Sequence, residues 1–238
     1  MTYRTLDAAA ILSTCERLSA RIDERFPGSG LSKVGRELLE LSRESGQRID
    51  DIRKPLWPIR VGAGLVLVLI LAIAIGVGVT APMPATRIEL FALLQFAETA
   101  INDMIFLGVA VFFLLTIEAR LKRRKTLRAL HQLRSIAHVI DMHQLTKDPE
   151  QLLSGGSDTS SSPKRTLSRF ELARYLDYCS EMLSIVSKIA ALYLQYLDDA
   201  LVLGAANDIQ NLTSALSSKI WQKIMIIDDV GTSERDVR

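Results

Sequence analysis

One long stretch of uncharged residues constrains this chain more than any other feature. Between Arg60 and Arg87 there are 26 consecutive residues without a charged side chain. As an α-helix, residues 61–81 would be about 31 Å long, close to the roughly 30 Å hydrocarbon core of a bilayer. In lipid, a single segment satisfies all its backbone hydrogen bonds only as a helix. We therefore assign a first transmembrane helix to residues 59–81.

A second apolar segment follows after a short connection. It has 14 uncharged residues between Asp103 and Glu118. Because a helix needs about 20 residues to cross a bilayer, we assign the second transmembrane helix to residues 94–119 and an extracytoplasmic connection to residues 82–93. The sequence thus predicts an all-α integral membrane protein with a two-helix transmembrane hairpin.

A polar stripe lies in the outer half of this second helix. Glu98, Asn102 and Asp103 are spaced so that they share one helical face. An ionisable group within a bilayer indicates a functional site, such as a pore lining, a proton site or a contact between helices. The alternative is that the helix sits lower in the bilayer and these side chains reach the outer interface.

Small residues in the first span offer a packing surface. Ala72 with Gly76, and Ala74 with Gly78, are pairs four residues apart. Such pairs let a second membrane helix approach closely. The alternative is that these small residues have no packing role, because such residues are common in membrane helices.

Basic residues indicate which way the hairpin is inserted. Arg87 is the only basic residue in the connection between the spans, whereas both outer flanks are rich in arginine and lysine. The positive-inside rule then places both chain termini in the cytoplasm. Cys15 and Cys179 would both be cytosolic and reduced. The flanking basic residues are Arg36, Arg43, Arg48, Arg53, Lys54 and Arg60 before the hairpin and Arg120, Lys122, Arg123, Arg124, Lys125 and Arg128 after it.

The cluster directly after the second span is a candidate lipid-binding site. Five of the six residues 120–125 are basic: Arg120, Lys122, Arg123, Arg124 and Lys125. Each basic residue at a membrane surface contributes about 1 kcal/mol of attraction to anionic headgroups. The alternative is that the cluster only sets topology. We expect no binding of nucleic acid, since the net charge is only +2.

The cytoplasmic parts have the periodicity of amphipathic helices. We expect an N-terminal helical hairpin at residues 1–54, a cytoplasmic extension of the second span at 120–148, a flexible linker at 154–166, and C-terminal helices at 167–228. These helices carry more apolar surface than they could bury against one another in a small bundle. Self-association, including coiled-coil pairing, or docking of the N-terminal arm on the C-terminal helices would cover it.

Helix boundaries within the C-terminal region follow from capping signals. Ser168 followed by Glu171 predicts a capping box. The apolar pattern continues to about Leu203, which suggests a hinge at Gly204. We expect the polar tail at residues 231–238 to be frayed.

The sequence lacks the common motifs of catalytic sites. The chain has no GxSxG, HExxH, Walker A or CxxC motif. His131, His138 and His143 fall on one helix, but no two of them have the i, i+4 spacing usual for a helical metal pair. We therefore expect no metal, no cofactor and no catalytic site.

These observations favour a non-enzymatic two-span membrane protein that oligomerises, or scaffolds a cytoplasmic partner, through its cytoplasmic helices. The alternative is a small oligomeric ion channel or membrane-permeabilising effector that uses the polar stripe. Two spans flanked by cytosolic helices resemble, in topology alone, small bacterial two-span effector proteins. We expect the protein to lie in a bacterial inner membrane. The basic cluster predicts anionic lipid headgroups as one partner, and the apolar surface of the cytoplasmic helices predicts a second copy of the chain as another.

Overall fold

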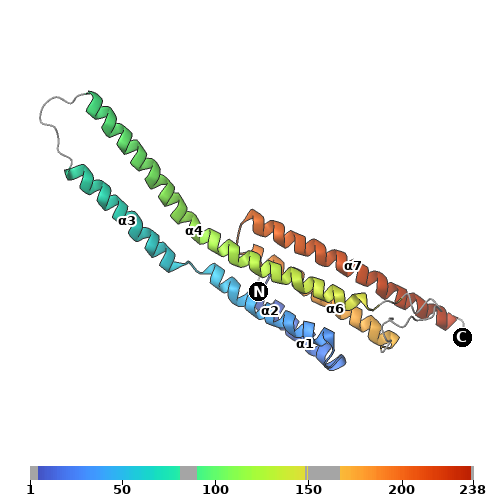
Figure 1. Cartoon of the computed structure of the whole chain (residues 1–238). Coiled ribbons are helices and arrows are strands. Elements are labelled where there is room, and N and C mark those ends of the chain that lie inside the picture. The colour runs from blue at the N-terminus through green and yellow to red at the C-terminus, as the bar shows by residue number, and fades with distance from the viewer. Residues whose placement is uncertain (1–4, 81–89, 148, 150–166, 237–238) are drawn as a thin grey trace. The chain divides into compact units, whose positions relative to one another are not determined.

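The protein was analysed as a computed structural model, which describes residues 5–80, 90–147, 149 and 167–236. Within these ranges every regular element is an α-helix (Figure 1), so the predicted all-α class is confirmed there. The predicted linker at 154–166 lies outside the described residues. The helices are α1 (Ala8–Arg25), α2 (Gly30–Arg53), α3 (Trp57–Thr80), α4 (Leu90–Leu145), α6 (Arg169–Leu194) and α7 (Ala200–Asp236).

The chain divides into two compact units. The first, Lys54–Arg124, contains α3 and the first part of α4 and is called the apolar unit below. The second, Met1–Arg53 together with Lys125–Arg238, contains the other helices and is called the bundle unit. Helix α4 is one continuous helix of 56 residues that contributes to both.

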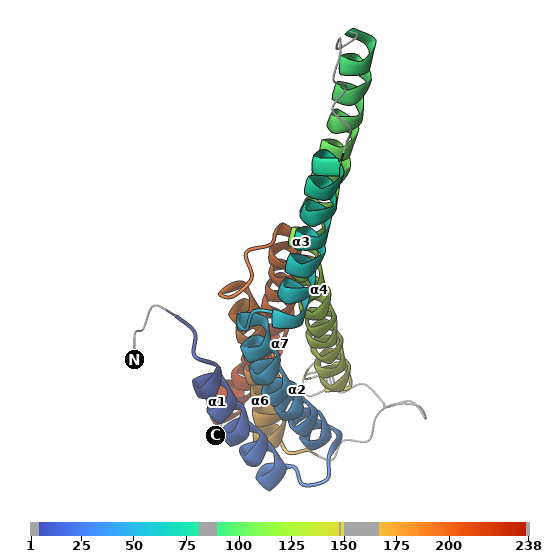
Figure 2. The ribbon, with the colours of Figure 1, turned by 90° about the vertical axis from the view of Figure 1, so that its left-hand side faces the viewer.

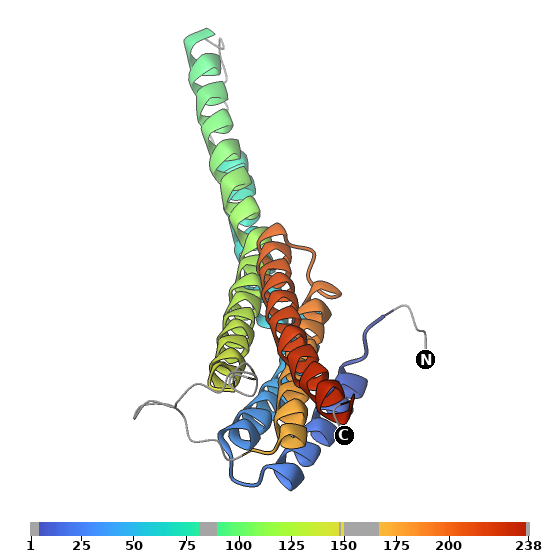
Figure 3. The same cartoon turned by 90° about the vertical axis from the view of Figure 1, so that its right-hand side faces the viewer.

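Helix α6 is the central helix of the bundle unit. Its buried residues, which include Tyr175, Met182 and Val186, are spread around most of the helix circumference. A helix that is apolar on several faces needs neighbours on several sides. Accordingly, α6 contacts α1, α2 and α7, and Figures 2 and 3 show α7 running alongside it.

The start of α6 confirms the predicted capping box. The backbone N–H of Ser168 donates to the Glu171 carboxylate at 2.7 Å. In return, the backbone N–H of Glu171 donates to the Ser168 hydroxyl at 3.3 Å. Two backbone donors that the helix cannot pair internally are thereby satisfied.

The N-terminal helices form a hairpin that docks on α6. The turn between α1 and α2 contains Gly28, whose φ of 68° lies in the left-handed region that favours glycine. Asp7 caps α1 by accepting from the backbone N–H of Ala9 at 3.0 Å. The apolar stripe of α1 is buried between α2 and α6, so docking of this arm covers it. The buried residues of α1 include Ile11, Cys15, Leu18 and Ile22.

The C-terminal part of α4 is a structural helix of the bundle unit. Arg48 of α2 donates to the side-chain oxygen of Gln132 at 2.6 Å. Lys223 of α7 donates to the backbone carbonyls of Gln144 at 3.2 Å and Lys147 at 3.4 Å, at the end of α4. The apolar seam of this part is at most 1% exposed and consists of Leu130, Leu133, Ala137 and Ile140.

The junction between the last two helices differs from the prediction. Helix α6 ends at Leu194 rather than near Leu203, and Gly204 lies within α7 instead of forming a hinge. The break occurs earlier because the Asp199 carboxylate accepts from the backbone N–H groups two and three residues further on and so starts α7. The tail predicted to fray is helical as far as Asp236, because residues 231–236 continue the helix of α7 and contain no proline to end it.

The apolar unit presents its large apolar side chains outward. Leu65, Val68, Met104 and Phe106 are between 64% and 75% exposed. Two helices are long and apolar enough to cross a bilayer, judged by length and composition alone. Helix α4 begins at Leu90, so the last part of the predicted connection is helical, because residues 90–93 contain no helix breaker.

Candidate membrane-surface site

Several charged residues of the apolar unit, among them Arg60, Glu118 and Lys122, lie where α3 begins. The backbone N–H of Leu56, just before α3, donates to the Glu118 carboxylate of α4 at 3.4 Å. The N-terminal end of α3 therefore lies beside residues 118–122 of α4. Trp57, at the start of α3, is 66% exposed there. An aromatic residue next to a charged layer is typical of a membrane–water interface.

Glu118 is the centre of an ion-pair network in this region. Its carboxylate accepts from Arg60 Nε of α3 at 2.8 Å and from Lys122 Nζ, one turn along α4, at 2.9 Å. The side chains of Glu118 and Lys122 are only 15% and 16% exposed, whereas that of Arg60 is 57% exposed. The pair between Arg60 and Glu118 joins residues 58 positions apart and connects the two apolar helices.

A cleft of about 380 Å³ lies on α4 next to this network. Its lining includes three guanidinium groups, those of Arg120, Arg123 and Arg124, together with Thr116 and Ala119. The guanidinium carbon of Arg120 lies 5.8 Å from the centre of the Phe113 ring, within the range of a cation–π contact. Planar guanidinium groups bind phosphate and carboxylate oxygens in pairs, so an anion is the ligand that this cleft suits chemically.

The structure separates the five basic residues that the sequence grouped together. Arg120, Arg123 and Arg124 line the cleft. Lys122 instead pairs with Glu118, and Lys125 belongs to the bundle unit. Sequence reasoning missed the role of Glu118, although the spacing of Glu118 and Lys122 (i, i+4) is the signal that could have revealed their pairing.

The polar stripe and the small-residue pairs are described only in part. Glu98 and Asn102 are exposed on α4, and Ala72 is exposed on α3. A Cβ added at Gly76 would meet no atom within 4 Å. The side chain of Asp103, and the predicted packing positions Ala74 and Gly78, lie outside the described side chains, so both sites stay predictions.

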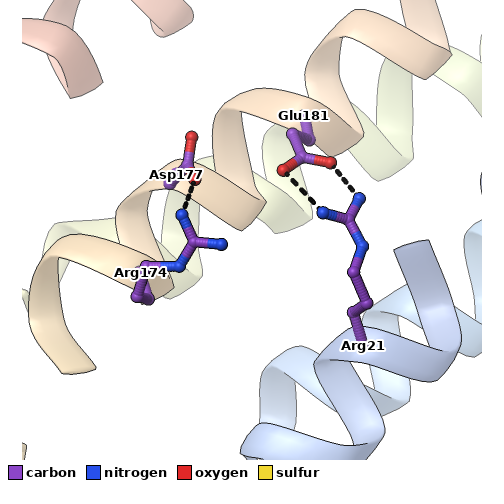
Figure 4. Close-up of polar contacts among 4 residues, drawn as sticks. All are labelled: Arg21, Arg174, Asp177 and Glu181. Atoms are coloured by element: carbon purple, nitrogen blue, oxygen red, sulfur yellow. Dashed lines mark hydrogen bonds and ion pairs between the residues drawn. The ribbon is translucent and has the colours of Figure 1, made fainter. Parts of the chain in front are cut away.

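Charged side chains of the bundle unit lie at the contact between α1 and α6 (Figure 4). Arg21 of α1 donates to both carboxylate oxygens of Glu181 on α6, at 2.5 and 3.5 Å. Arg174 donates to Asp177 at 2.8 Å, and the guanidinium carbons of Arg21 and Arg174 lie 5.7 and 5.4 Å from the centre of the buried Tyr178 ring. The pair between Arg21 and Glu181 joins α1 to α6, whereas the pair between Arg174 and Asp177 lies within α6.

The bundle unit also has a cleft of about 1,020 Å³ between the start of α1 and the ends of α2 and α6. Its lining includes Ala9, Ile49, Ile185 and Tyr196 and is mostly apolar. Gly46 of α2 contributes to the same cleft, and a Cβ added there would meet no atom within 4 Å.

The two cysteines are buried and unpaired as disulfides. Burial raises the pKa of both Cys15 and Cys179 to about 12. At neutral pH both thiols are therefore protonated and poorly nucleophilic. Among the described residues, no three His, Cys, Asp or Glu side chains come together in a way that could hold a metal ion.

No family model matches this chain, and neither the curated proteins nor the solved structures contain a match to it.

Proposed function

We propose that this protein is a non-enzymatic integral membrane protein that oligomerises or scaffolds partners through its cytoplasmic helices. In this proposal α3 and α4 form a transmembrane hairpin, and the bundle unit lies in the cytoplasm. The observation that carries the proposal is the contrast between the two units. The apolar unit exposes its large side chains, while the bundle unit buries a continuous core of its own.

The exposed apolar surface of α3 and α4 supports insertion into lipid. In water, each fully exposed large apolar side chain forgoes about 1.5–3 kcal/mol of burial free energy. Contiguous apolar surface of this kind marks a membrane or protein contact. The Glu118 network and the three cleft arginines, at the end where α3 begins, suit the cytoplasmic interface.

Apolar groups on the bundle unit support contact with another chain. Met142 and Leu145 of α4, and Trp221 and Met225 of α7, are more than half exposed although they are large and apolar. The N-terminal hairpin packs on α6 and so covers much of the apolar surface for which the sequence alone specified no partner. What remains supports a modest interface, for which a second copy of the chain is the first candidate.

The second candidate is an oligomeric channel or membrane-permeabilising effector. The observation that favours it is the exposure of Glu98 and Asn102 on the apolar unit. Polar groups at such a position avoid lipid by facing a partner helix or a water-filled pore.

The two candidates differ in ion conduction and in the role of Asp103. We would measure the oligomeric mass in mild detergent and the ion flux in liposomes, for the wild-type protein and for Asp103→Leu. The matched control is Met104→Leu, at the exposed apolar neighbour. The scaffold proposal expects an oligomer, or a complex with a partner, and no flux. Flux that Asp103→Leu abolishes and Met104→Leu preserves would establish the channel instead.

A topology measurement tests membrane insertion itself. Reporter fusions at Arg238 and near Pro84 should give cytoplasmic and extracytoplasmic signals, respectively. A cytoplasmic signal from both sites, with the chain released by alkaline carbonate, would contradict a transmembrane hairpin.

A further inference from the structure

We infer that the cleft of about 1,020 Å³ in the bundle unit, called the bundle cleft below, binds a long-chain fatty acid. The inference goes beyond the proposed function, and only its last argument rests on membrane insertion. The volume lies at the upper end of the roughly 300–1,000 Å³ that is typical of small-molecule sites. The bundle cleft therefore has room for an acyl chain.

The first argument is the apolar base of the bundle cleft. Ile11 of α1, Ile49 of α2 and Ile185 of α6 all line it, although they are only between 2% and 8% exposed. Each of the three helices thus contributes an apolar side chain deep in the cleft. An acyl chain that packs on these side chains leaves water for an apolar surface, which favours binding.

The second argument is that small residues keep the bundle cleft open. Ala9 and Ala10 of α1 and Gly46 of α2 line it, and a Cβ added at Gly46 would meet no atom within 4 Å. Larger side chains at these positions would fill the space, as side chains usually do between packed helices.

The segment before α1 is fixed at the same cleft. The backbone N–H of Leu6, a lining residue, donates to the side-chain oxygen of Gln195 at 2.9 Å. The side-chain nitrogen of Gln195 donates back to the Leu6 carbonyl at 3.2 Å. These two hydrogen bonds attach the segment to the end of α6, so the bundle cleft is held by three tethered elements.

The third argument is the charge of the lining. Asp7 accepts a hydrogen bond at the positive end of α1, and Arg43 forms ion pairs with two glutamates. Arg53 pairs with Asp50 at 3.9 Å. Lys188, one turn after Ile185 on α6, donates to the neutral Ser184 hydroxyl at 2.6 Å and forms no ion pair within the described ranges. A ligand carboxylate would balance its charge.

A fatty acid combines the two features that the bundle cleft offers to a ligand. Its acyl chain suits the three isoleucines, and its carboxylate suits Lys188. A fatty alcohol of the same length has the chain without the charge. The predicted preference is therefore for the acid over the alcohol.

The last argument is the supply of the ligand. Arg53, in the lining, is followed four residues later by Trp57, where α3 begins. Four residues span at most about 14 Å. Membrane insertion of α3 would therefore keep this end of α2 within reach of fatty acids dissolved in the bilayer.

The test is photo-crosslinking of the full-length protein, in mild detergent, with palmitate that carries a diazirine in its chain. Peptide mass spectrometry locates the adducts, which we expect in residues 5–14 and 42–53 of the lining. Unlabelled palmitate should suppress these adducts. Hexadecanol should need about tenfold more for the same effect, equivalent to about 1.4 kcal/mol.

A bulky residue in the bundle cleft should block the ligand. Gly46→Phe should lower the yield of these adducts about tenfold or more. The matched control is Gly204→Phe, at an exposed glycine of α7 where an added Cβ also meets no atom within 4 Å, and it should keep the yield within about twofold. Should Gly46→Phe fail to fold by circular dichroism, Ala9→Phe, at an exposed position of the lining, replaces it.

Removal of the lysine charge tests recognition of the carboxylate. Lys188→Gln should abolish the advantage of palmitate over hexadecanol as a competitor. Lys219→Gln removes the same charge from an exposed position on α7 outside the lining and should preserve that advantage.

Four results would overturn the inference. Adducts confined to α3 and α4 would mean that the bundle cleft takes no acyl chain, which leaves a protein segment as its occupant. Equal losses in Gly46→Phe and Gly204→Phe would mean that the labelling is not specific to the cleft. Equal competition by hexadecanol in the wild type would mean that no carboxylate is selected. Competition by phosphatidylglycerol as strong as that by palmitate would mean a site for membrane lipid.

Failure of membrane insertion has a different outcome. Adducts in α1 and α2 of a chain that alkaline carbonate releases from membranes would support this inference and contradict the transmembrane hairpin alone.

Discussion

Two glycines of α2 show how single residues depend on their surroundings. A Cβ added at Gly30 would overlap the imidazole ring of His143 in α4, so the His143 side chain would have to turn away. At Gly46, in the middle of the same helix, a Cβ would meet no atom within 4 Å. A side chain at Gly30 would therefore displace a neighbour, whereas a side chain at Gly46 would enter open space.

The first prediction compares these two positions. Gly46→Ala should stabilise the protein by about 0.5–1 kcal/mol, because glycine within a helix is less favourable than alanine by that amount. Gly30→Ala should stabilise it less than Gly46→Ala does, because part of the gain is lost when the His143 ring moves aside. Denaturant unfolding followed by circular dichroism in detergent measures both. A midpoint for Gly30→Ala equal to or above that of Gly46→Ala would contradict the close approach of His143.

The second prediction concerns the pH dependence of stability. The thiol pKa of Cys15 and Cys179 is about 12 when folded, against an ordinary value of 9.0. Above pH 9 the unfolded chain loses thiol protons that the folded chain keeps, so the free energy of unfolding falls as pH rises from about 9 to 12. Each thiol contributes a slope of up to about 1.4 kcal/mol per pH unit.

Cys179→Ala provides the control for this prediction. The variant should show a shallower decrease in stability between pH 9 and pH 11 than the wild type. Below pH 8 the two proteins should depend on pH in the same way, because the thiol is protonated in both states. Identical alkaline slopes would show that the Cys179 thiol is not protected by burial.

At the scale of helices, caps decide where α6 and α7 begin. The third prediction is that Ser168→Ala destabilises the protein by about 1 kcal/mol, because the capping box loses its hydroxyl acceptor. Ser184→Ala, at an exposed position within α6, should be neutral or slightly stabilising, since alanine is the better helix former. Equal losses at both positions would contradict a specific role for the cap.

At the scale of the whole molecule, the core of the bundle unit is formed by two chain segments. One segment precedes the apolar unit in the sequence and the other follows it. The hydrogen bond between Arg48 and Gln132 brings these two parts of the chain together. Arg53 and Lys125, the residues that flank the apolar unit, lie only a few residues from that contact. A short linker could therefore replace everything between them.

The fourth prediction is that this replacement yields a soluble protein. A Gly/Ser linker of about 10 residues spans up to roughly 30 Å, which is sufficient to join Arg53 to Lys125. We expect the variant to be helical, to unfold cooperatively and to need no detergent. A second variant that also lacks residues 1–53 should aggregate, because α6 would lose the cover of α1 and α2. A requirement for detergent in the first variant would contradict an independent bundle.

Much of the local structure is determined by the sequence itself. The apolar helices, the turn after α1, the capping box at Ser168 and the buried seam of α4 all follow from residue type and spacing within one or two helical turns. These features depend on backbone geometry and local hydrogen bonding, so neighbouring residues carry enough information to predict them. The polar composition of residues 231–238 did not predict the end of the last helix correctly, since α7 continues to Asp236.

Which helix faces meet was decided only by the tertiary structure. The i, i+4 spacing within α4 accounts for the pairing of Lys122 with Glu118, but only the approach of α3 to α4 brings Arg60 to the same carboxylate. Likewise, α6 is central because α1, α2 and α7 all pack on it. The partners in these contacts lie far apart along the chain, and no local spacing specifies which charge or apolar face will be nearest once the helices have packed.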